Sequence, residues 1–525
     1  MRSRSIRSVA KVSVGSLLAG VALVGLPQSA SANGQEIPEN GTEIMGRAGA
    51  WTARADNPMA AALNPAGLAG QPTALLVNAN LTWQKYCFQR TGNYASSGLD
   101  NGKTIFQGQD YSGQPYPEVC KDNKVGDVNV VPQLAFNYHV NDKLGIAFAI
   151  VTPSGAGKAK WPDQVTINGD NLAPAPQRYM LLEQNGVVIQ PTLAVGYEVA
   201  KGIRLGVAFQ ATMAFLKFAN TSRATNSPPG DPAESPNGDL RADLTVKKLF
   251  TPGIILGALF SPTDELDIGA MFKWSADIHS SSADVKVTGP YYGTSQDAAS
   301  TPAVSTGTGE FRAAIPWEIR TGVRWHPTRK DGKVAPSGKR HDFLATDLFD
   351  LELDLTYAHN SSFDTLDITF AGGQCIAFGS NPCPNKLPPD TSIPHKWRDT
   401  FGARLGGEFV AVPERLGIRA GAFVQGNGQD PDYAALDFLP SSMFGFYLGG
   451  TLRLSKVVDV ALGFGHVFLH GLNNGPNGQV HGIAATTGTC ADGTPTPAYR
   501  GCNVVNSGKF SGGYNMASLG ATFKF

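Results

Sequence analysis

The chain has 525 residues, of which 16% are charged, and its 43 basic and 43 acidic side chains give a formal net charge of zero. This balance offers no electrostatic argument for nucleic acid or for an acidic partner. A chain of this length ordinarily predicts two or more soluble domains. Its 61 glycines and mean hydropathy of −0.13 instead favour many short strands joined by polar loops.

Residues 1–32 have the three parts of a secretory signal peptide. A basic region ends at Lys11, an apolar stretch covers 12–26, and Ala30-Ser31-Ala32 supplies a small-residue cleavage site. A membrane anchor would need about 20 apolar residues, and no later segment approaches that length. We therefore expect residues 1–32 to be cleaved and the mature chain to be exported.

Residues 33–72 form a segment that is rich in small residues, does not alternate and is broken by proline. It is too short and too broken to build a domain of its own. Either it is a flexible leader, or it folds back as a plug into whatever the rest of the chain builds.

The remaining chain, 73–525, contains fourteen runs in which apolar residues alternate with polar or small ones, the period-two pattern of a β-strand. In one run Leu266, Ile268 and Phe272 oppose Asp267 and Gly269. Short turns alternate with loops of roughly fifteen to forty residues, as in an up-and-down barrel. The runs cover 75–83, 134–138, 144–150, 187–197, 203–213, 244–260, 265–281, 315–325, 351–357, 401–409, 416–424, 443–454, 457–469 and 510–525.

These runs predict an all-β fold. A soluble sandwich alternates in the same way, but long strands, an even strand number and the turn–loop alternation favour a 14-stranded antiparallel transmembrane β-barrel. It would lie in the bacterial outer membrane with its long loops extracellular. Aromatic residues near the turn ends would form the girdle at one membrane interface, namely Tyr138, Tyr197, Trp325 and Phe525.

The polar face of the runs would line the lumen. A barrel of 14 strands is wider than side chains alone can fill and narrower than an open porin, so something else must occupy its middle. Because an unpaired buried charge is costly, we expect the lumen charges to pair with one another and with Arg47 or Asp56. These charges are Arg204, Glu318, Arg320, Glu352, Asp354, Arg404, Glu408 and Arg419.

The six cysteines fall in pairs within, or at the root of, single predicted loops. Only local pairing staples each loop to itself, so we expect three disulfides formed in an oxidising compartment. No CxxC spacing occurs, which argues against a metal site. The expected pairs are Cys87–Cys120, Cys375–Cys383 and Cys490–Cys502.

One connection on the short-turn side, residues 326–346, is long and basic. Runs of like charge are usually solvated. We therefore expect a solvated periplasmic loop there.

The nearest approach to a catalytic triad is Asp277, His279 and Ser281, on one face of a predicted strand. Residues two apart on a strand lie about 7 Å apart, beyond the hydrogen-bond reach that a nucleophile and its base require. We therefore expect no enzyme, and neither a cofactor nor a metal is implied.

The segment before the first strand resembles the N-terminal hatch of the FadL/TodX family, outer-membrane transporters of long-chain fatty acids and other hydrophobic compounds. The run Asn64-Pro65-Ala66-Gly67-Leu68 contains the family's NPA tripeptide, and weaker matches occur at 151–157, 314–318 and 439–440. The resemblance covers the mature chain and implies 14 strands with a hatch over 33–72. The matching hatch residues are Gly46, Arg47, Asp56, Asn64, Pro65 and Ala66.

The resemblance also implies a route for passive uptake. Extracellular loops catch a hydrophobic ligand, which enters a pocket beside the hatch and leaves sideways through a kink in the third strand. In this chain the third strand loses its alternation at Pro153, Gly155 and Gly157, and such residues interrupt regular pairing. Alternatively, Pro153 simply ends the strand at its loop.

The implied partners are a hydrophobic small molecule, the outer-membrane bilayer and, through the terminal Phe525, the barrel-assembly machinery. Two other functions stay open on the residues alone. Lumen charges could select ions in a general porin, in which case the barrel would conduct freely. Loops stapled by disulfides could instead serve a surface adhesin.

Overall fold

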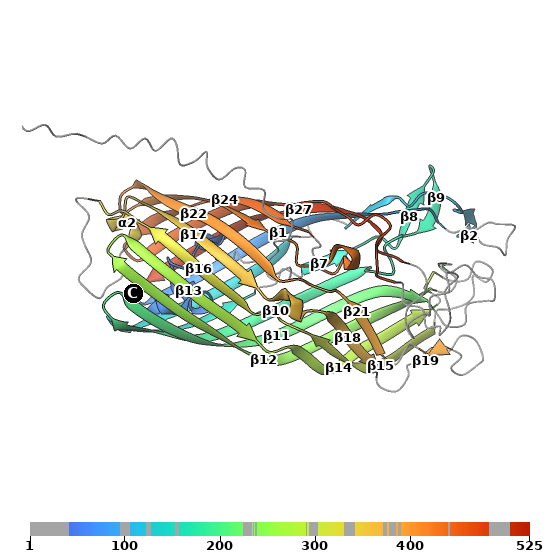
Figure 1. Ribbon diagram of the computed structural model, residues 1–525, viewed down its shortest axis with the longest axis horizontal. Helices are drawn as coiled ribbons and strands as arrows, with labels where there is room; N and C mark the ends of the chain where they lie inside the picture. Colours follow the sequence, from blue (N-terminus) through green and yellow to red (C-terminus); the bar gives the residue numbers. More distant parts are fainter. Residues whose placement is uncertain are drawn as a thin grey trace, which may run out of the picture.

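The computed structural model describes residues 41–94, 105–121, 128–152, 157–223, 234, 236, 239–289, 291–292, 303–329, 342–370, 375–376, 385–386, 390–438, 441–481 and 504–525. Their long strands form one closed antiparallel barrel of 14 strands, as predicted (Figure 1). Pairing of β1 with β27 closes the ring. The barrel strands are β1 (Ala74–Arg90), β5 (Asn129–Asn141), β6 (Leu144–Val151), β10 (Glu183–Ala200), β11 (Ile203–Arg223), β12 (Asp239–Thr263), β13 (Leu266–Ser275), β16 (Glu318–Trp325), β17 (Phe349–Ala358), β22 (Thr400–Val412), β23 (Leu416–Gln425), β24 (Met443–Ser455), β25 (Val458–Leu469) and β27 (Gly508–Lys524).

Several barrel strands are interrupted and continue towards the long-loop end as separate strands. These outer parts are β7 (Gly157–Lys160) above β6, β14 (Ile278–Gly289) above β13, β15 (Ala303–Ala313) above β16, β18 (Thr365–Phe370) above β17 and β21 (Asp390–Pro394) above β22. β4 (Glu118–Cys120) pairs with β1, and β26 (Leu472–Asn473) pairs with β27. Three small hairpins lie among the loops: β2 (Ile105–Phe106) with β3 (Gln109–Asp110), β8 (Gln164–Ile167) with β9 (Asn171–Pro174), and β19 (Cys375–Ile376) with β20 (Asn385–Lys386).

Helices in the described ranges are short. α1 (Thr42–Met45), η2 (Pro58–Ala62) and η3 (Pro65–Leu68) precede β1, and α2 (Phe343–Thr346) lies between β16 and β17. η5 (Asn360–Ser362) and η6 (Pro431–Tyr433) belong to loops. No helix in this part of the chain is long and apolar enough to cross a membrane.

The two faces of the barrel wall follow the predicted alternation. Leu193 on β10 is 56% exposed and Leu355 on β17 is 54% exposed, whereas Thr192 and Asp354 beside them are buried. The apolar face therefore points outward, as a lipid-facing surface requires. All four residues expected in the aromatic girdle are exposed on this outer surface, namely Tyr138, Tyr197, Trp325 and Phe525.

The strands are longer than a membrane crossing needs. A tilted strand crosses the hydrocarbon core in about 9–11 residues, whereas β11 has 21 residues and β12 has 25. On β11 the outward apolar residues run from Ile203 to Phe215, and the next outward side chain is Lys217. The long-loop half of these strands consequently extends beyond the lipid-facing band.

Candidate functional site: the lumen and the segment inside it

The described part of the N-terminal segment, residues 41–72, lies inside the short-turn half of the barrel (Figure 1, blue). α1 contacts β24, β25 and β27, while η3 contacts β10, β11 and β12 on the other side. η2 lies against β6 and β10. Side chains from Thr42 to Leu68 are mostly buried, which is the placement that a plug requires. We call the space that this segment fills the lower lumen.

Two Asn-Pro steps shape the segment. Asn57 and Asn64 each cap a short 3-10 helix, with the side-chain oxygen accepting from the backbone N–H two residues later. Proline fits the first helical position because it lacks an N–H that would need a partner. The Asn64 amide also donates to Thr52 O at 2.7 Å and to Ala258 O on β12 at 3.2 Å. The NPA tripeptide thus fixes η3 to its own segment and to the wall.

A row of four glycines forms the surface against which η3 lies. They are directly paired neighbours on four successive strands: Gly145 on β6, Gly196 on β10, Gly206 on β11 and Gly257 on β12. A Cβ on Gly206 would stand 2.2 Å from Ala66 N, and one on Gly145 would stand 2.2 Å from Leu68 O. Only glycine allows backbone to approach backbone this closely.

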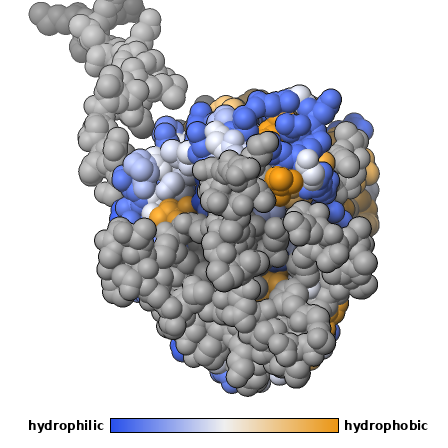
Figure 2. Space-filling model, turned by 90° about the vertical axis from the view of Figure 1, so that its right-hand side faces the viewer, coloured by the Kyte–Doolittle hydropathy of each residue, from blue (hydrophilic) through white to orange (hydrophobic). Residues whose placement is uncertain are grey.

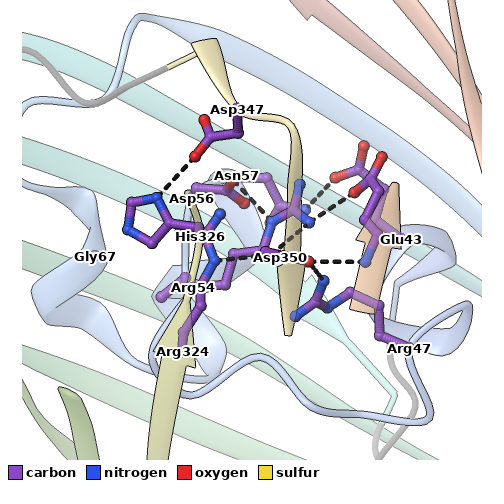
Figure 3. A network of polar contacts seen from close by, with 12 residues as sticks. Glu43, Arg47, Arg54, Asp56, Asn57, Gly67, Arg324, His326, Asp347 and Asp350 are labelled. Atoms are coloured by element: carbon purple, nitrogen blue, oxygen red, sulfur yellow. Dashed lines mark hydrogen bonds and ion pairs between the residues drawn. The ribbon is translucent and has the colours of Figure 1, made fainter. Parts of the chain in front are cut away.

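Ion pairs to carboxylates of the barrel wall, chiefly Asp350 on β17, hold the segment in place; we call this ion-pair cluster the clamp. Asp350 forms ion pairs with Arg47, with Arg54 at 3.2 Å and with Arg324 on β16 at 2.8 Å (Figure 3). Arg54 also pairs with Glu408 at 2.6 Å. These groups are almost fully buried, and the loss of one partner from such a cluster leaves uncompensated buried charge.

The next two acidic residues of β17 accept hydrogen bonds from the segment's backbone. Asp354 Oδ2 accepts from the Trp51 and Thr52 N–H groups at 3.0 Å, and Glu352 Oε1 accepts from Ala53 N–H at 2.7 Å. Asp350, Glu352 and Asp354 all point inward because they alternate along one strand. One strand therefore presents three successive carboxylates to residues 47–54.

The expected pairing of lumen charges is found for most of the predicted residues, with one difference. Arg47 bonds to barrel carboxylates, but Asp56 pairs with Arg54 of its own segment at 2.9 Å. Arg419 pairs with Glu408 on the neighbouring strand. Other pairs follow the wall: Arg320 with Glu318 and Arg204 with Glu198.

The prediction that 326–346 is a solvated loop is wrong for both described ends of that connection. His326 is buried and contacts Asp347 at 2.7 Å and Asp267 at 3.2 Å. Phe343 of α2 is buried beneath Arg54, whose guanidinium lies 4.4 Å from the ring centroid. A charged sequence can pack when each charge finds an opposite partner, which a count of like charges does not show. Residues 330–341 lie outside the described ranges.

Towards the long loops the inward side chains become apolar. A buried cluster over β12, β14, β15 and β18 lines this part of the interior, which we call the upper lumen: Val188, Ala214, Leu240, Leu244, Val246, Ile278, Ala283, Val285, Val287, Phe311, Ala313, Phe363, Leu366 and Trp397. Figure 2 shows this end of the molecule, where a few hydrophobic side chains lie among a mostly hydrophilic described surface. The same barrel thus has a charged lower lumen and an apolar upper lumen.

The ionisable side chain of His395 packs against the aromatic part of this apolar cluster. His395 lies within 5.4 Å of the Phe363 and Phe438 ring centroids, and its Nε2 contacts Asp437 at 2.8 Å. Burial lowers the pKa of His395, but the Asp437 carboxylate and the Ile393 carbonyl together outweigh burial and leave the pKa above its ordinary value.

The pairing of the third strand with β10 has a break in register between β6 and β7. β6 pairs with Gln190–Tyr197 of β10 and β7 pairs with Glu183–Gly186. Five residues, 152–156, connect β6 to β7, whereas β10 has three residues, 187–189, over the same interval. Regular pairing cannot accommodate two extra residues. Predicted kink residue Gly157 is the first residue of β7, and Pro153 and Gly155 lie outside the described ranges.

Other predicted residues have the following positions. Cys87 and Cys120 form the expected disulfide, which joins β1 to β4. Cys375 lies on β19, while Cys383, Cys490 and Cys502 lie outside the described ranges. Gly46 contacts Gly449 of β24, and Pro65 and Ala66 lie against the glycine row.

Two of the three predicted triad residues have partners outside the triad. Asp277 pairs with Arg312 at 2.9 Å and His279 with Glu310 at 3.6 Å, on the outer face. Within the described ranges, the one cluster with metal-ligand spacing is Cys87, Glu118 and Cys120. Its two sulfurs are joined in the disulfide, so they are not available as thiolate ligands.

The sequence analysis did not identify the glycine row. It also did not identify Asp350 and Arg54, two members of the ion-pair cluster that holds the N-terminal segment. The glycines were visible on the polar faces of the predicted strands, but their alignment depends on the pairing register. Asp350 precedes the run predicted at 351–357, and Arg54 lies in a segment without periodicity.

Comparison with known proteins gives consistent matches. The family model for outer membrane protein transport proteins (OMPP1/FadL/TodX) matches residues 23–426. A Pseudomonas aeruginosa FadL homologue is 16% identical, with a TM-score of 0.64 over 94% of this chain and 100% of that one. The Pseudomonas putida toluene transporter TodX is 13% identical, with a TM-score of 0.55 over 95% and 99% of the two chains. The Ralstonia pickettii toluene transporter TbuX is also 13% identical, with a TM-score of 0.54 over 94% and 99%. A search of curated sequences finds no match.

Proposed function

Because the chain belongs to the FadL/TodX family of outer-membrane transport proteins, we propose that it takes up hydrophobic compounds such as long-chain fatty acids by passive diffusion. The ligand enters from the long-loop end, which faces the cell exterior in barrels of this kind. It leaves sideways through the break in the third strand.

The apolar upper lumen supports a hydrophobic ligand. Burying a methylene group contributes about 0.8 kcal/mol, so a long acyl chain gains more from this lining than from an aqueous pore. Leu244, Val246 and Val285 belong to this buried apolar cluster and lie on the adjacent strands β12 and β14. Ions or sugars would gain nothing from the same surface.

The observation that carries the lateral route is the position of the strand break. Ala149 and Val151, at the end of β6, pack in one buried cluster with Met59 and Ala60 of η2. The break therefore adjoins the top of the segment that fills the lower lumen. A ligand stopped by the segment would meet the irregular part of the wall next, and Pro153, Gly155 and Gly157 would form the opening.

Deletion of Ser154 and Gly155 tests this route. It reduces the five connecting residues to three, so that pairing with β10 can run without interruption. We expect uptake of radiolabelled oleate, by cells that lack their own transporter, to fall at least tenfold while the barrel still folds. Deletion of Ser227 and Pro228, between β11 and β12, is the matched control and should leave uptake unchanged. Normal uptake by the first variant would exclude the lateral route.

Mass spectrometry of apolar molecules extracted from the purified barrel tests the substrate class. We expect a stoichiometric apolar ligand that is lost when residues 33–72 are deleted. An empty barrel with large, steady ion conductance in planar bilayers would favour a general porin instead.

A further inference from the structure

A polar groove crosses the outer face of the barrel just beyond the lipid-facing band. It has a volume of about 510 Å³. It lies on β11, β12, β14 and β15, on the side opposite to the apolar upper lumen. The residues that line it are Lys217, Asp243, Thr245, Asp284, Val285, Lys286, Thr306, Gly307 and Thr308. We call it the outer groove.

The pairing register arranges the polar side chains of the groove in two parallel rows. One row runs Lys217, Thr245, Asp284, Thr308 across the four strands, and the other runs Asp243, Lys286, Thr306 across three of them. Neighbouring strands are about 4.8 Å apart, a spacing comparable with the width of one sugar ring. The result is a flat lattice in which hydrogen-bond donors alternate with acceptors.

The height of the groove on the barrel determines what surrounds it. Lys217 is the next outward residue after Phe215, which ends the apolar band of β11, and Leu249 and Phe250 end that of β12 beside it. Charged side chains above this band cannot face hydrocarbon. They face the headgroup layer of the outer leaflet, which in a bacterial outer membrane consists of glycolipid.

The charges favour a neutral, hydroxyl-rich ligand over an anion. Lys217 lies 3.4 Å from Glu183 and 3.6 Å from Asp243, and Arg241 pairs with the same two carboxylates. With Asp284 and Lys286, the groove and the two residues paired with it hold three cations and three anions, while Lys247 is exposed on the same face of β12 two residues from Thr245. The paired charges of the groove itself therefore give a phosphate as much repulsion as attraction. A sugar hydroxyl both donates and accepts, and it can bond to Asp, Lys and Thr in turn.

We propose that the outer groove binds the saccharide headgroup of an outer-leaflet glycolipid. This inference rests on the outer-membrane location of the barrel and is independent of the transported substrate. Bound sugar would hold the long-loop half of β12, β14 and β15 at a fixed height in the leaflet.

Native mass spectrometry of the full-length barrel in detergent tests the proposal. The probes are lipopolysaccharide with a complete core, lipid A that has the same acyl chains and phosphates but no core sugar, and the free core oligosaccharide. We expect the complete lipopolysaccharide to bind at least tenfold more tightly than lipid A, and excess free oligosaccharide to displace it. Equal binding of lipid A, or failure of the oligosaccharide to compete, would mean that acyl chains and phosphates hold the lipid and would overturn the proposal.

The double variant Asp284→Ala/Lys286→Ala should lower lipopolysaccharide binding about tenfold, because it removes one acceptor and one donor from the centre of the lattice. Lys201→Ala/Asp264→Ala removes the same two charges from exposed turns at the opposite end and should bind as the unmodified protein does. A difference in electrophoretic migration between unheated and heated samples checks that both variants fold. Unchanged binding by the first variant would refute the assignment, whichever substrate the barrel transports.

Discussion

The lower and upper lumen are built by the same barrel but hold their contents in different ways. In the lower lumen, charged side chains and backbone amides of residues 41–72 meet carboxylates and glycines at fixed positions. In the upper lumen, aliphatic and aromatic side chains form a surface without directional partners. Directional contacts hold one object in one place, whereas apolar contacts can be exchanged among similar ligands. This difference is what the proposed function requires, namely a fixed segment in the lower lumen and an exchangeable ligand in the upper lumen.

The largest effect should come from the clamp on the plug. Asp350→Asn removes a charge that Arg47, Arg54 and Arg324 share. Loss of one partner from a buried ion cluster costs about 3–5 kcal/mol, so we expect lower thermal stability and transient ion conductance in planar bilayers.

Asp342→Asn is the matched control for that substitution. Asp342 pairs with Arg453, but its side chain is 46% exposed, and exposed pairs contribute at most about 1 kcal/mol. Equal losses of stability in the two variants would show that the clamp does not hold the plug.

A second effect should follow from the glycine row. Gly206→Val would place side-chain carbon against Ala66 and Pro65 backbone, since even a Cβ stands 2.2 Å from Ala66 N. Overpacking of this kind costs about 3 kcal/mol, and η3 should move from the wall. Protease sensitivity of residues 64–70 measures the displacement. Gly471→Ala, where the nearest atom is 3.5 Å away, should have no effect, and an intact segment in Gly206→Val would contradict the role of the row.

The sequence predicted the barrel strands and the location of the N-terminal segment, but it did not predict the contacts between them. Period-two alternation identified all fourteen barrel strands, because a lipid-facing surface forces the pattern, although the run predicted at 265–281 divides into β13 and the start of β14. The NPA tripeptide located the segment that fills the lower lumen. The clamp could not be predicted, because Asp350, Arg54 and Arg324 meet only through the placement of a non-periodic segment inside the barrel. The glycine row needed the register across four strands, which alternation does not give.

The upper lumen can be tested without disturbing the plug. Val246→Thr keeps the shape of the side chain but adds a buried hydroxyl, at a cost of about 1–2 kcal/mol. If hydrophobic ligands bind to this apolar surface, the added hydroxyl should weaken their binding, and oleate uptake should fall several-fold while bilayer conductance stays low. Val457→Thr, at an exposed turn, is the control. A rise in conductance with Val246→Thr would mean that the two halves of the lumen are not independent.

The smallest effect concerns His395, an ionisable group packed among aromatic rings of the upper lumen. Its folded pKa is raised above the ordinary 6.5 because Asp437 and the Ile393 carbonyl together outweigh burial. A raised pKa stabilises the fold below about pH 6.5, and this contribution is lost as pH rises through the folded value. Hydrogen exchange of residues 390–398, corrected for intrinsic rates, should therefore be slower at pH 5.5 than at pH 8.5. In Asp437→Asn the pH dependence should reverse, because without the carboxylate burial lowers the folded pKa and the neutral imidazole then favours the fold at the higher pH. If protection in that variant were still greater at pH 5.5 than at pH 8.5, a titratable group other than His395 would be responsible for the pH dependence.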